Sequence, residues 1–323
     1  MAGRRAHARD ECENAVDERY NRAVSNARIS GHFLLAFLAI PLLLGSACEK
    51  KKPSDTGAMA AADRAGSAVD RTPLTGIDTS KLDEDKQKLF YMLVGSLNSP
   101  CGKGHSLRTS YATDTSCKRA PFAVKYVLAL VEDEIPEGPI RQAFAVKYES
   151  KEPQVKLDTG KAPRIGNDDA PIRFIEFYDY ACHVCQEFKP VADKVIEQHG
   201  EKIVFYFMMY PLGKWPDSKS AGQASIAAAQ QGKFKEMHQI LFTRAAHSHA
   251  AVTGYAKEIG LDLEKFEAAY TAAAPQVDSD HAQGEKVGVT GTPVIFFNEH
   301  RYDGPRSPKY IGMWIEEEVA VNR

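Results

Sequence analysis

A strongly apolar run that ends just before two cysteines constrains the fold of this chain more than any other segment. The run "IRFIEFYDY" (172–180) is dense in β-branched and aromatic residues, which is typical of a strand buried on both faces. It is followed by "ACHVC", and from Val184 onward apolar residues recur at helical spacing. The two cysteines therefore stand where a buried strand passes into a helix.

Further strands and helices alternate along the C-terminal half of the chain. The run "KIVFYFMMY" (202–210) predicts a second buried strand and "PVIFFN" (293–298) a third. Between them, residues 218–275 are rich in alanine and predict helices, and an amphipathic helix is expected over 307–321. This order predicts an α/β fold with helices on the faces of a sheet.

The spacing CxxC has several chemical interpretations. Attachment of haem requires a histidine directly after the second cysteine, and Gln186 stands there. A zinc ribbon requires a second CxxC, which the sequence lacks. A structural disulfide is rare at this spacing where a strand passes into a helix. These exclusions favour a pair that exchanges electrons.

The start of a helix is a favourable place for a reactive thiolate. Cys182 is expected beside unpaired backbone N–H groups and the positive end of the helix dipole, which lower the pKa of a thiol. Cys185, one turn further, is expected to be shielded and to act as the resolving thiol. His183 is either a cation or donor beside the sulfur or a solvated surface histidine.

The region 155–323 resembles the DsbA-like branch of the thioredoxin superfamily, most clearly between residues 163 and 321. Glu176 stands six residues before Cys182, where this branch has an acidic residue beneath the active site. Pro190 stands where helices of this fold commonly kink, and "AAAQQGKFKEMHQILF" resembles the helical insertion of the branch. The resemblance implies a thioredoxin-like fold with a helical insertion.

The segment "VTGTP" (289–293) resembles the loop that faces the CxxC in this family. The resemblance implies a cis bond between Thr292 and Pro293, which shape the groove for an extended client peptide. The central residues His183 and Val184 depart from the frequent pattern with proline after the first cysteine. The direction of the reaction (oxidase, isomerase or reductase) therefore stays open.

The resemblance also implies an enzyme, a protein thiol–disulfide oxidoreductase. Cys182 forms the mixed disulfide with a client protein and Cys185 resolves it. Glu176, if buried, exchanges a proton with Cys185; the alternative is an exposed strand carboxylate. The expected partners are client proteins with cysteines and a membrane-bound or soluble redox partner. No cofactor and no resident metal are required.

A second class of function uses the same side chains. A thioredoxin-like copper carrier would bind the metal through Cys182, Cys185 and His183 as soft ligands. Glu176 and the 289–293 loop favour redox work, because copper transfer requires neither. A redox-inactive chaperone is disfavoured, since both cysteines are present.

The N-terminus has the order of a secretory signal. Arg22 and Arg28 precede the apolar run "GHFLLAFLAIPLLLGSAC", which gives a signal region over 1–47; an uncleaved anchor is the alternative. Residues 1–30 are long and polar for a signal and are consistent with an upstream start codon. "LLGSAC" resembles a bacterial lipobox, although Gly45 replaces the preferred leucine, so Cys48 is the expected site of lipidation.

These features predict a protein on the periplasmic side of the bacterial cell envelope, attached to a membrane by lipid. Residues 48–80 are rich in small and charged residues and predict a flexible tether. The net charge of −2 is spread over both signs and offers no basic field for nucleic acid.

Residues 81–150 predict a small helical domain that precedes the α/β region. Its first two helices flank a polar loop with Cys101 and Cys117 at its ends. In an exported protein these cysteines are expected to form a disulfide. A zinc site with His105 is the alternative, but it would be one ligand short of a tetrahedral set.

Overall fold

The computed structural model describes residues 69–150 and 154–321. Residues from Val69 onward form one compact unit. The predicted signal region 1–47, the lipidation site Cys48 and most of the predicted tether lie outside the described residues.

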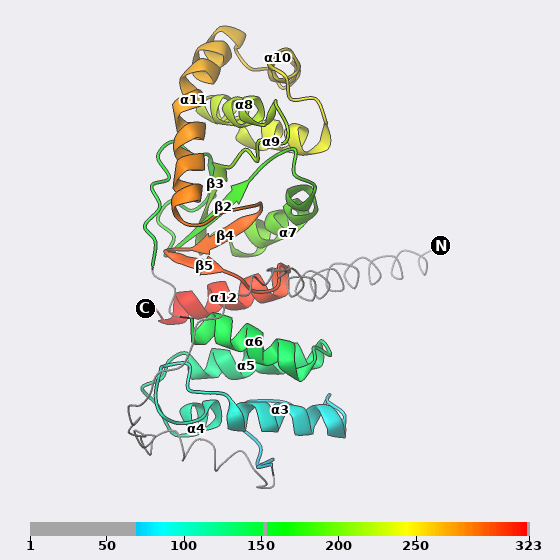
Figure 1. The fold of residues 1–323 in the computed structure, drawn as a ribbon, viewed down its shortest axis with the longest axis vertical. Helices are drawn as coiled ribbons and strands as arrows, with labels where there is room; N and C mark the ends of the chain where they lie inside the picture. Colours follow the sequence, from blue (N-terminus) through cyan, green and yellow to red (C-terminus); the bar gives the residue numbers. More distant parts are fainter. Residues whose placement is uncertain (1–68, 151–153, 322–323) are drawn as a thin grey trace, which may run out of the picture. The chain divides into compact units, whose positions relative to one another are not determined.

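The second part of the chain is built on a five-stranded mixed sheet (Figure 1). Its strands are β1 (Arg164–Gly166), β2 (Ile172–Tyr178), β3 (Ile203–Met209), β4 (Val294–Phe297) and β5 (His300–Tyr302). The order is β1-β3-β2-β4-β5, with β2 parallel to β3 and every other neighbouring pair antiparallel. The central position of β2 explains its apolar sequence, because it is covered on both faces.

Side chains of the central strands alternate between two apolar cores. One core packs strand residues against helices, among them Phe174, Tyr178, Phe205, Phe207, Ile295 and Phe297. The other contains Ile175, Phe177, Met208 and Phe296, together with Leu157 and Val289 from loops. The period of two along β2 therefore decides which side chains face the helix that carries the cysteines.

The helices of this part follow the predicted order. They are α7 (His183–His199), α8 (Ser218–Gln230), α9 (Phe234–Thr243), α10 (His249–Glu258), α11 (Leu263–Lys286) and α12 (Pro308–Val321). Helices α8 to α11 stand between β3 and β4 in the chain, and Figure 1 shows α8, α9 and α10 gathered at one end of the sheet. Pro190 lies inside α7. The predicted thioredoxin-like fold with a helical insertion is confirmed.

The first part of the described chain is helical, as expected. It comprises α3 (Glu84–Ser96), α4 (Leu107–Ala112), α5 (Ala120–Glu132) and α6 (Glu137–Tyr148) around a core of its own. The predicted tether does not reach residue 80. Leu74 is buried in this core, Arg108 Nη2 donates to the Thr72 carbonyl and Tyr111 donates to that of Thr75. A few apolar and backbone contacts thus fix residues whose composition indicates a flexible chain.

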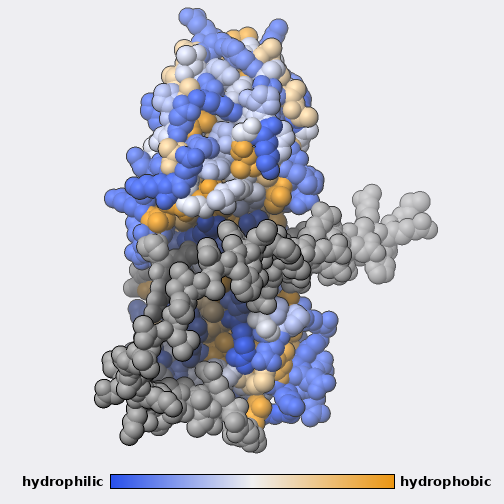
Figure 2. Space-filling model, viewed as in Figure 1, coloured by the Kyte–Doolittle hydropathy of each residue, from blue (hydrophilic) through white to orange (hydrophobic). Residues whose placement is uncertain are grey.

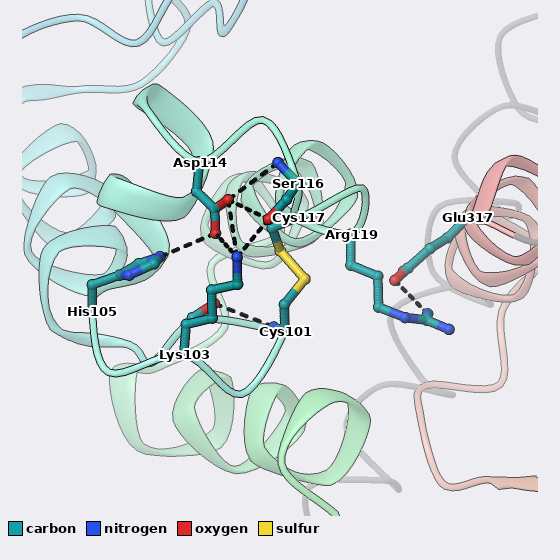
Figure 3. Close-up of a disulfide and its surroundings, with 9 residues drawn as sticks. Cys101, Lys103, His105, Asp114, Ser116, Cys117, Arg119 and Glu317 are labelled. Atoms are coloured by element: carbon teal, nitrogen blue, oxygen red, sulfur yellow. Dashed lines mark hydrogen bonds and ion pairs between the residues drawn. A yellow bond between two sulfur atoms is a disulfide. The ribbon is translucent and has the colours of Figure 1, made fainter.

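Cys101 and Cys117 are joined by a disulfide that closes the loop around α4 (Figure 3). Asp114, beside this bridge, accepts hydrogen bonds from Ser116 and Lys103, which lower its pKa to about 2. His105 is the third ligand of the zinc alternative. Its Nε2 atom lies 3.5 Å from Oδ2 of Asp114. In this structure the two sulfurs bond to each other.

A buried ionic cluster links the helical part to α12 of the sheet part. Glu317 is 1% exposed and accepts from Arg119 at 2.8 Å, from Tyr148 at 2.9 Å and from Lys147 at 2.9 Å. The Lys147 ammonium also lies 4.0 Å from the centre of the Trp314 ring. Buried charge requires such partners, so the cluster fixes α6 and the start of α5 against α12.

The described part of the chain exposes few large apolar side chains. Only Val146, Val184 and Leu263 are exposed among the described large apolar residues. On the face seen in Figure 2, hydrophilic and intermediate residues predominate over the insertion helices, with small, separate hydrophobic areas between them. Within the described residues, no helix has the length and apolarity needed to cross a membrane.

Candidate functional site

The two cysteines lie where β2 passes into α7. Cys182 is the N-cap residue of α7, with extended backbone angles, and Cys185 lies within the first turn of this helix. Both are free thiols, and Cys185 is fully buried whereas Cys182 is 6% exposed. As at the start of any α-helix, the backbone N–H groups of the first turn have no partners within the helix.

The two thiols have opposite electrostatic environments. The pKa of Cys182 is lowered to about 5, chiefly by a hydrogen bond from the Cys185 thiol, then by the side chain of Thr292, and further by the backbone N–H groups of Cys185 and Val184. Burial raises the pKa of Cys185, and the hydrogen bond that it gives to Cys182 acts in the same direction. Cys182 is therefore the thiol that ionises first.

The 289–293 loop contributes a contact to Cys182. The bond between Thr292 and Pro293 is cis, and Pro293 directly precedes β4. The Cys182 thiol lies 3.5 Å from the Thr292 carbonyl oxygen, to which it donates. The structure thus brings together residues that are 110 positions apart in the sequence.

Glu176 lies on β2, on the face that packs against α7. It is 3% exposed, and its neighbours across the sheet are Phe207 and Ile295. Burial raises its pKa to about 8, although the positive charges of Arg306 and Lys189 act in the opposite direction. Its charge also raises the pKa of Cys185. Glu176 is therefore a buried acid beneath the cysteines, not an exposed strand carboxylate.

His183 is exposed on the outer side of α7. Its side chain is 77% exposed, and Nε2 lies 3.1 Å from the Glu187 carboxylate one turn further along the helix. Residues i and i+4 share a helix face. The structure therefore favours the solvated interpretation of His183 over a donor beside the sulfur.

Two hydrogen-bonded groups next to the cysteines were not identified from the sequence. The buried Asp179 carboxylate accepts from the backbone N–H of Ala181 and from Ser218. The Tyr180 hydroxyl lies 2.9 Å from His238 Nδ1 on α9, and both side chains are buried. The signal available in the sequence was Asp179, a polar residue within the mainly apolar run 172–180, since buried polar groups require partners.

Among the residues that the structure describes, no three or more His, Cys, Asp or Glu side chains are grouped in a way that could hold a metal ion.

Curated relatives share part of this chain. A Na(+)/H(+) antiporter NhaA 1 of Mycobacterium sp. (strain KMS) is 33% identical over 146 residues, which are 43% of this chain and 24% of that protein. A Na(+)/H(+) antiporter NhaA 3 of Salinispora tropica is 28% identical over 175 residues, 52% of this chain and 27% of that protein. The chain thus spans about a quarter of the length of these relatives.

Solved structures with a similar fold include BdbD from Bacillus subtilis in its oxidised form and the catalytic domain of Proteus mirabilis ScsC. BdbD is 23% identical, with a TM-score of 0.45 over 51% of this chain and 97% of the other. ScsC is 22% identical, with a TM-score of 0.43 over 50% of this chain and 90% of the other.

The family assignment rests on residues 158–317, which match the family described as Thioredoxin. This region contains the mixed sheet, α7 with both cysteines, and the helices between β3 and β4. Through residues 158–317, this chain belongs to the thioredoxin family, with four helices inserted between β3 and β4.

Proposed function

We propose that this protein is an exported thiol–disulfide oxidoreductase that acts on proteins through Cys182 and Cys185. The observation that supports it most is the opposite perturbation of the two thiols, with the pKa of Cys182 lowered to about 5 and that of Cys185 raised. A thiolate is both the attacking and the better leaving group in disulfide exchange. This asymmetry gives each cysteine a separate role.

The proposed direction is oxidation of client thiols. A client thiolate attacks Cys182 Sγ of the Cys182–Cys185 disulfide, the S–S bond breaks, and the Cys185 sulfur leaves with the electron pair. A second client thiolate attacks the client sulfur of the mixed disulfide and releases the Cys182 thiolate. The client then has one disulfide, and the enzyme has gained two electrons, which a membrane-bound or soluble redox partner must accept.

Thiolate stabilisation supports this direction. A lowered pKa at Cys182 stabilises the reduced form, and a stabilised reduced form makes the disulfide a stronger oxidant. We expect a reduction potential less negative than the roughly −270 mV of thioredoxin. Equilibration with glutathione measures it, and a potential at or below that of thioredoxin would indicate a reductase instead.

Glu176 and the 289–293 loop have supporting roles in this proposal. Glu176 supplies the proton that the leaving Cys185 thiolate takes, since burial raises the pKa of this carboxyl to about 8. Thr292, whose carbonyl oxygen lies 3.5 Å from the Cys182 sulfur, and the adjacent Pro293 border the site where an extended client peptide binds.

The experiment that tests the proposal compares the two cysteines directly. In the reduced protein, iodoacetamide at pH 6 should label Cys182 well before Cys185, because only Cys182 is ionised there. The variant Cys185→Ser should accumulate mixed disulfides with clients, and Cys182→Ser should lose exchange entirely. Faster labelling of Cys185, or activity in Cys182→Ser, would contradict the assigned roles.

We also propose that the mature protein begins at a lipidated Cys48 and is attached on the periplasmic side of the envelope. The support is the basic, apolar and small residues that precede Cys48. Mass spectrometry of the N-terminal peptide from membranes checks this; an unmodified Cys48 would remove the anchor and leave the exchange chemistry unaffected.

A further inference from the structure

Asp179 lies between β2 and Cys182 and is fully buried. One carboxylate oxygen accepts from Ala181 N at 2.9 Å and from Ser218 Oγ at 2.8 Å. The other accepts from Leu212 N at 3.0 Å. A buried carboxylate of this kind is stable only with several donors, and here the donors come from three separate segments.

Each donor belongs to a different part of the site. Ala181 directly precedes Cys182, Leu212 is in the loop after β3, and Ser218 is the first residue of α8. The backbone of Asp179 takes part as well, because its carbonyl accepts from Cys182 N at 3.0 Å. One residue therefore joins the turn before the reactive cysteine to the loop after β3 and to the start of the insertion.

The orientation of this turn matters for the chemistry at Cys182. The hydrogen bond from the Cys185 side chain lowers the pKa of this thiol most, and the backbone N–H groups of Cys185 and Val184 lower it further, so the sulfur must stay aligned with all of these donors. Hydrogen bonds lose strength steeply as their angles depart from linearity. A turn that rotates by a small angle would move the sulfur away from these donors.

We propose that Asp179 is a positioning residue that holds the turn before Cys182 and keeps the Cys182 sulfur aligned with the N-terminus of α7. This inference rests on the proposed function and names a residue that acts through Cys182 without contacting the client. The negative charge of Asp179 disfavours a neighbouring thiolate, so loss of this charge alone would lower the pH midpoint of Cys182 ionisation. Loss of positioning would instead raise that midpoint.

The substitutions Asp179→Asn and Asp179→Ala separate these two effects. Asparagine has one acceptor oxygen in place of two, so its NH2 group faces at least one of the three donors. Alanine removes all three bonds. Both variants should raise the pH midpoint of Cys182 labelling by about one unit, as expected when hydrogen bonding to a charged group is weakened.

Asp280→Asn is the matched control. Asp280 is also fully buried and accepts from the backbone N–H of Met209 at the end of β3 and from Gln276. Its loss should lower the melting temperature and leave the Cys182 midpoint unchanged. The variant Ser218→Ala removes one of the three donors and should raise the Cys182 labelling midpoint by a smaller amount. It replaces Asp179→Ala as the test if that variant does not fold.

The measurement is the rate of iodoacetamide labelling of Cys182 between pH 4 and pH 8 in the reduced full-length protein, read from its own peptide by mass spectrometry. A higher labelling midpoint in the Asp179 variants, with no change in Asp280→Asn, supports the positioning role. An unchanged or lower midpoint in Asp179→Asn, or an equal shift in Asp280→Asn, would overturn it. A wild-type midpoint near the ordinary thiol value would instead refute the low pKa behind the proposed function.

Discussion

Replacing Glu176 with glutamine should stabilise the protein, and the gain should grow with pH. Glutamine has nearly the same shape as a protonated glutamic acid, so the packing against Phe207 and Ile295 is retained. The charge is what changes. Ionisation of a carboxyl buried among aromatic and aliphatic side chains requires desolvation of the anion, which is unfavourable.

The size of the effect follows from proton linkage. Burial raises the pKa of Glu176 from 4.5 to about 8 in the folded protein. Between these values the folded protein binds one proton more than the unfolded chain, so the stability from this group is complete below pH 4.5 and falls as pH rises toward 8. The slope is about 1.4 kcal/mol per pH unit, and the loss between pH 5 and pH 7.5 is about 3 kcal/mol.

Urea unfolding at several pH values measures this difference. Both the parent and Glu176→Gln carry serine in place of Cys182 and Cys185. No reductant is then needed, so the Cys101–Cys117 disulfide stays intact. Other titrating groups cancel in the difference between the two proteins. The free energy of unfolding of Glu176→Gln, relative to that of the parent, should increase by about 3 kcal/mol between pH 5 and pH 7.5.

Two outcomes would refute this reasoning. A difference that is constant with pH would mean that Glu176 titrates alike in the folded and unfolded states. A parent protein that is more stable than Glu176→Gln at pH 7.5 would mean that the folded state stabilises the ionised Glu176 side chain. The positive charges of Arg306 and Lys189 would then outweigh the unfavourable effect of burial. Coincident unfolding curves by fluorescence and circular dichroism show that the two-state analysis applies.

Two further predictions concern the helical part. Glu317→Ala should lower the free energy of unfolding by about 3 to 5 kcal/mol, because Lys147 would remain buried without its anion. In urea titrations, the double variant Lys147→Met/Glu317→Leu should recover most of this loss. A double variant as unstable as Glu317→Ala would contradict the explanation. Replacing Cys101 and Cys117 together with serine should cost about 3 kcal/mol by freeing a loop that the disulfide closes over 16 positions. Thermal unfolding that is unchanged from that of the intact protein would argue against a stabilising bridge.

Much of the fold could be predicted because its signals are local. The long apolar runs of β2 and β3 indicate buried strands wherever they stand in a chain, and the order of elements gives the fold class. Strand β1, Arg164–Gly166, has three residues and no apolar period, so nothing local distinguishes it from a loop. Helix α4, Leu107–Ala112, is equally short and lies within a polar segment.

The parts of the site that depend on distant partners could not be predicted in the same way. Asp179 is visible in the sequence, but Leu212 and Ser218 become its donors only after β3 and α8 are in place. Lys147 and Glu317 belong to helices far apart in the chain, and their pairing requires α12 to pack on the helical part. Amphipathic patterns show which face of a helix is buried and do not identify the helix that covers it.

The contrast between the two thiols arises from their positions at one junction. Cys182 stands where α7 begins, so the Cys185 thiol and the free N–H groups of the first turn stabilise its anion, whereas Cys185 lies among buried side chains. Ionisation at Cys182 and protonation at Cys185 are thus favoured by the same arrangement. Burial makes the Glu176 anion unfavourable as well, so this carboxyl retains a proton at neutral pH. When the Cys185 sulfur leaves the disulfide, the acid beneath it is therefore still able to donate.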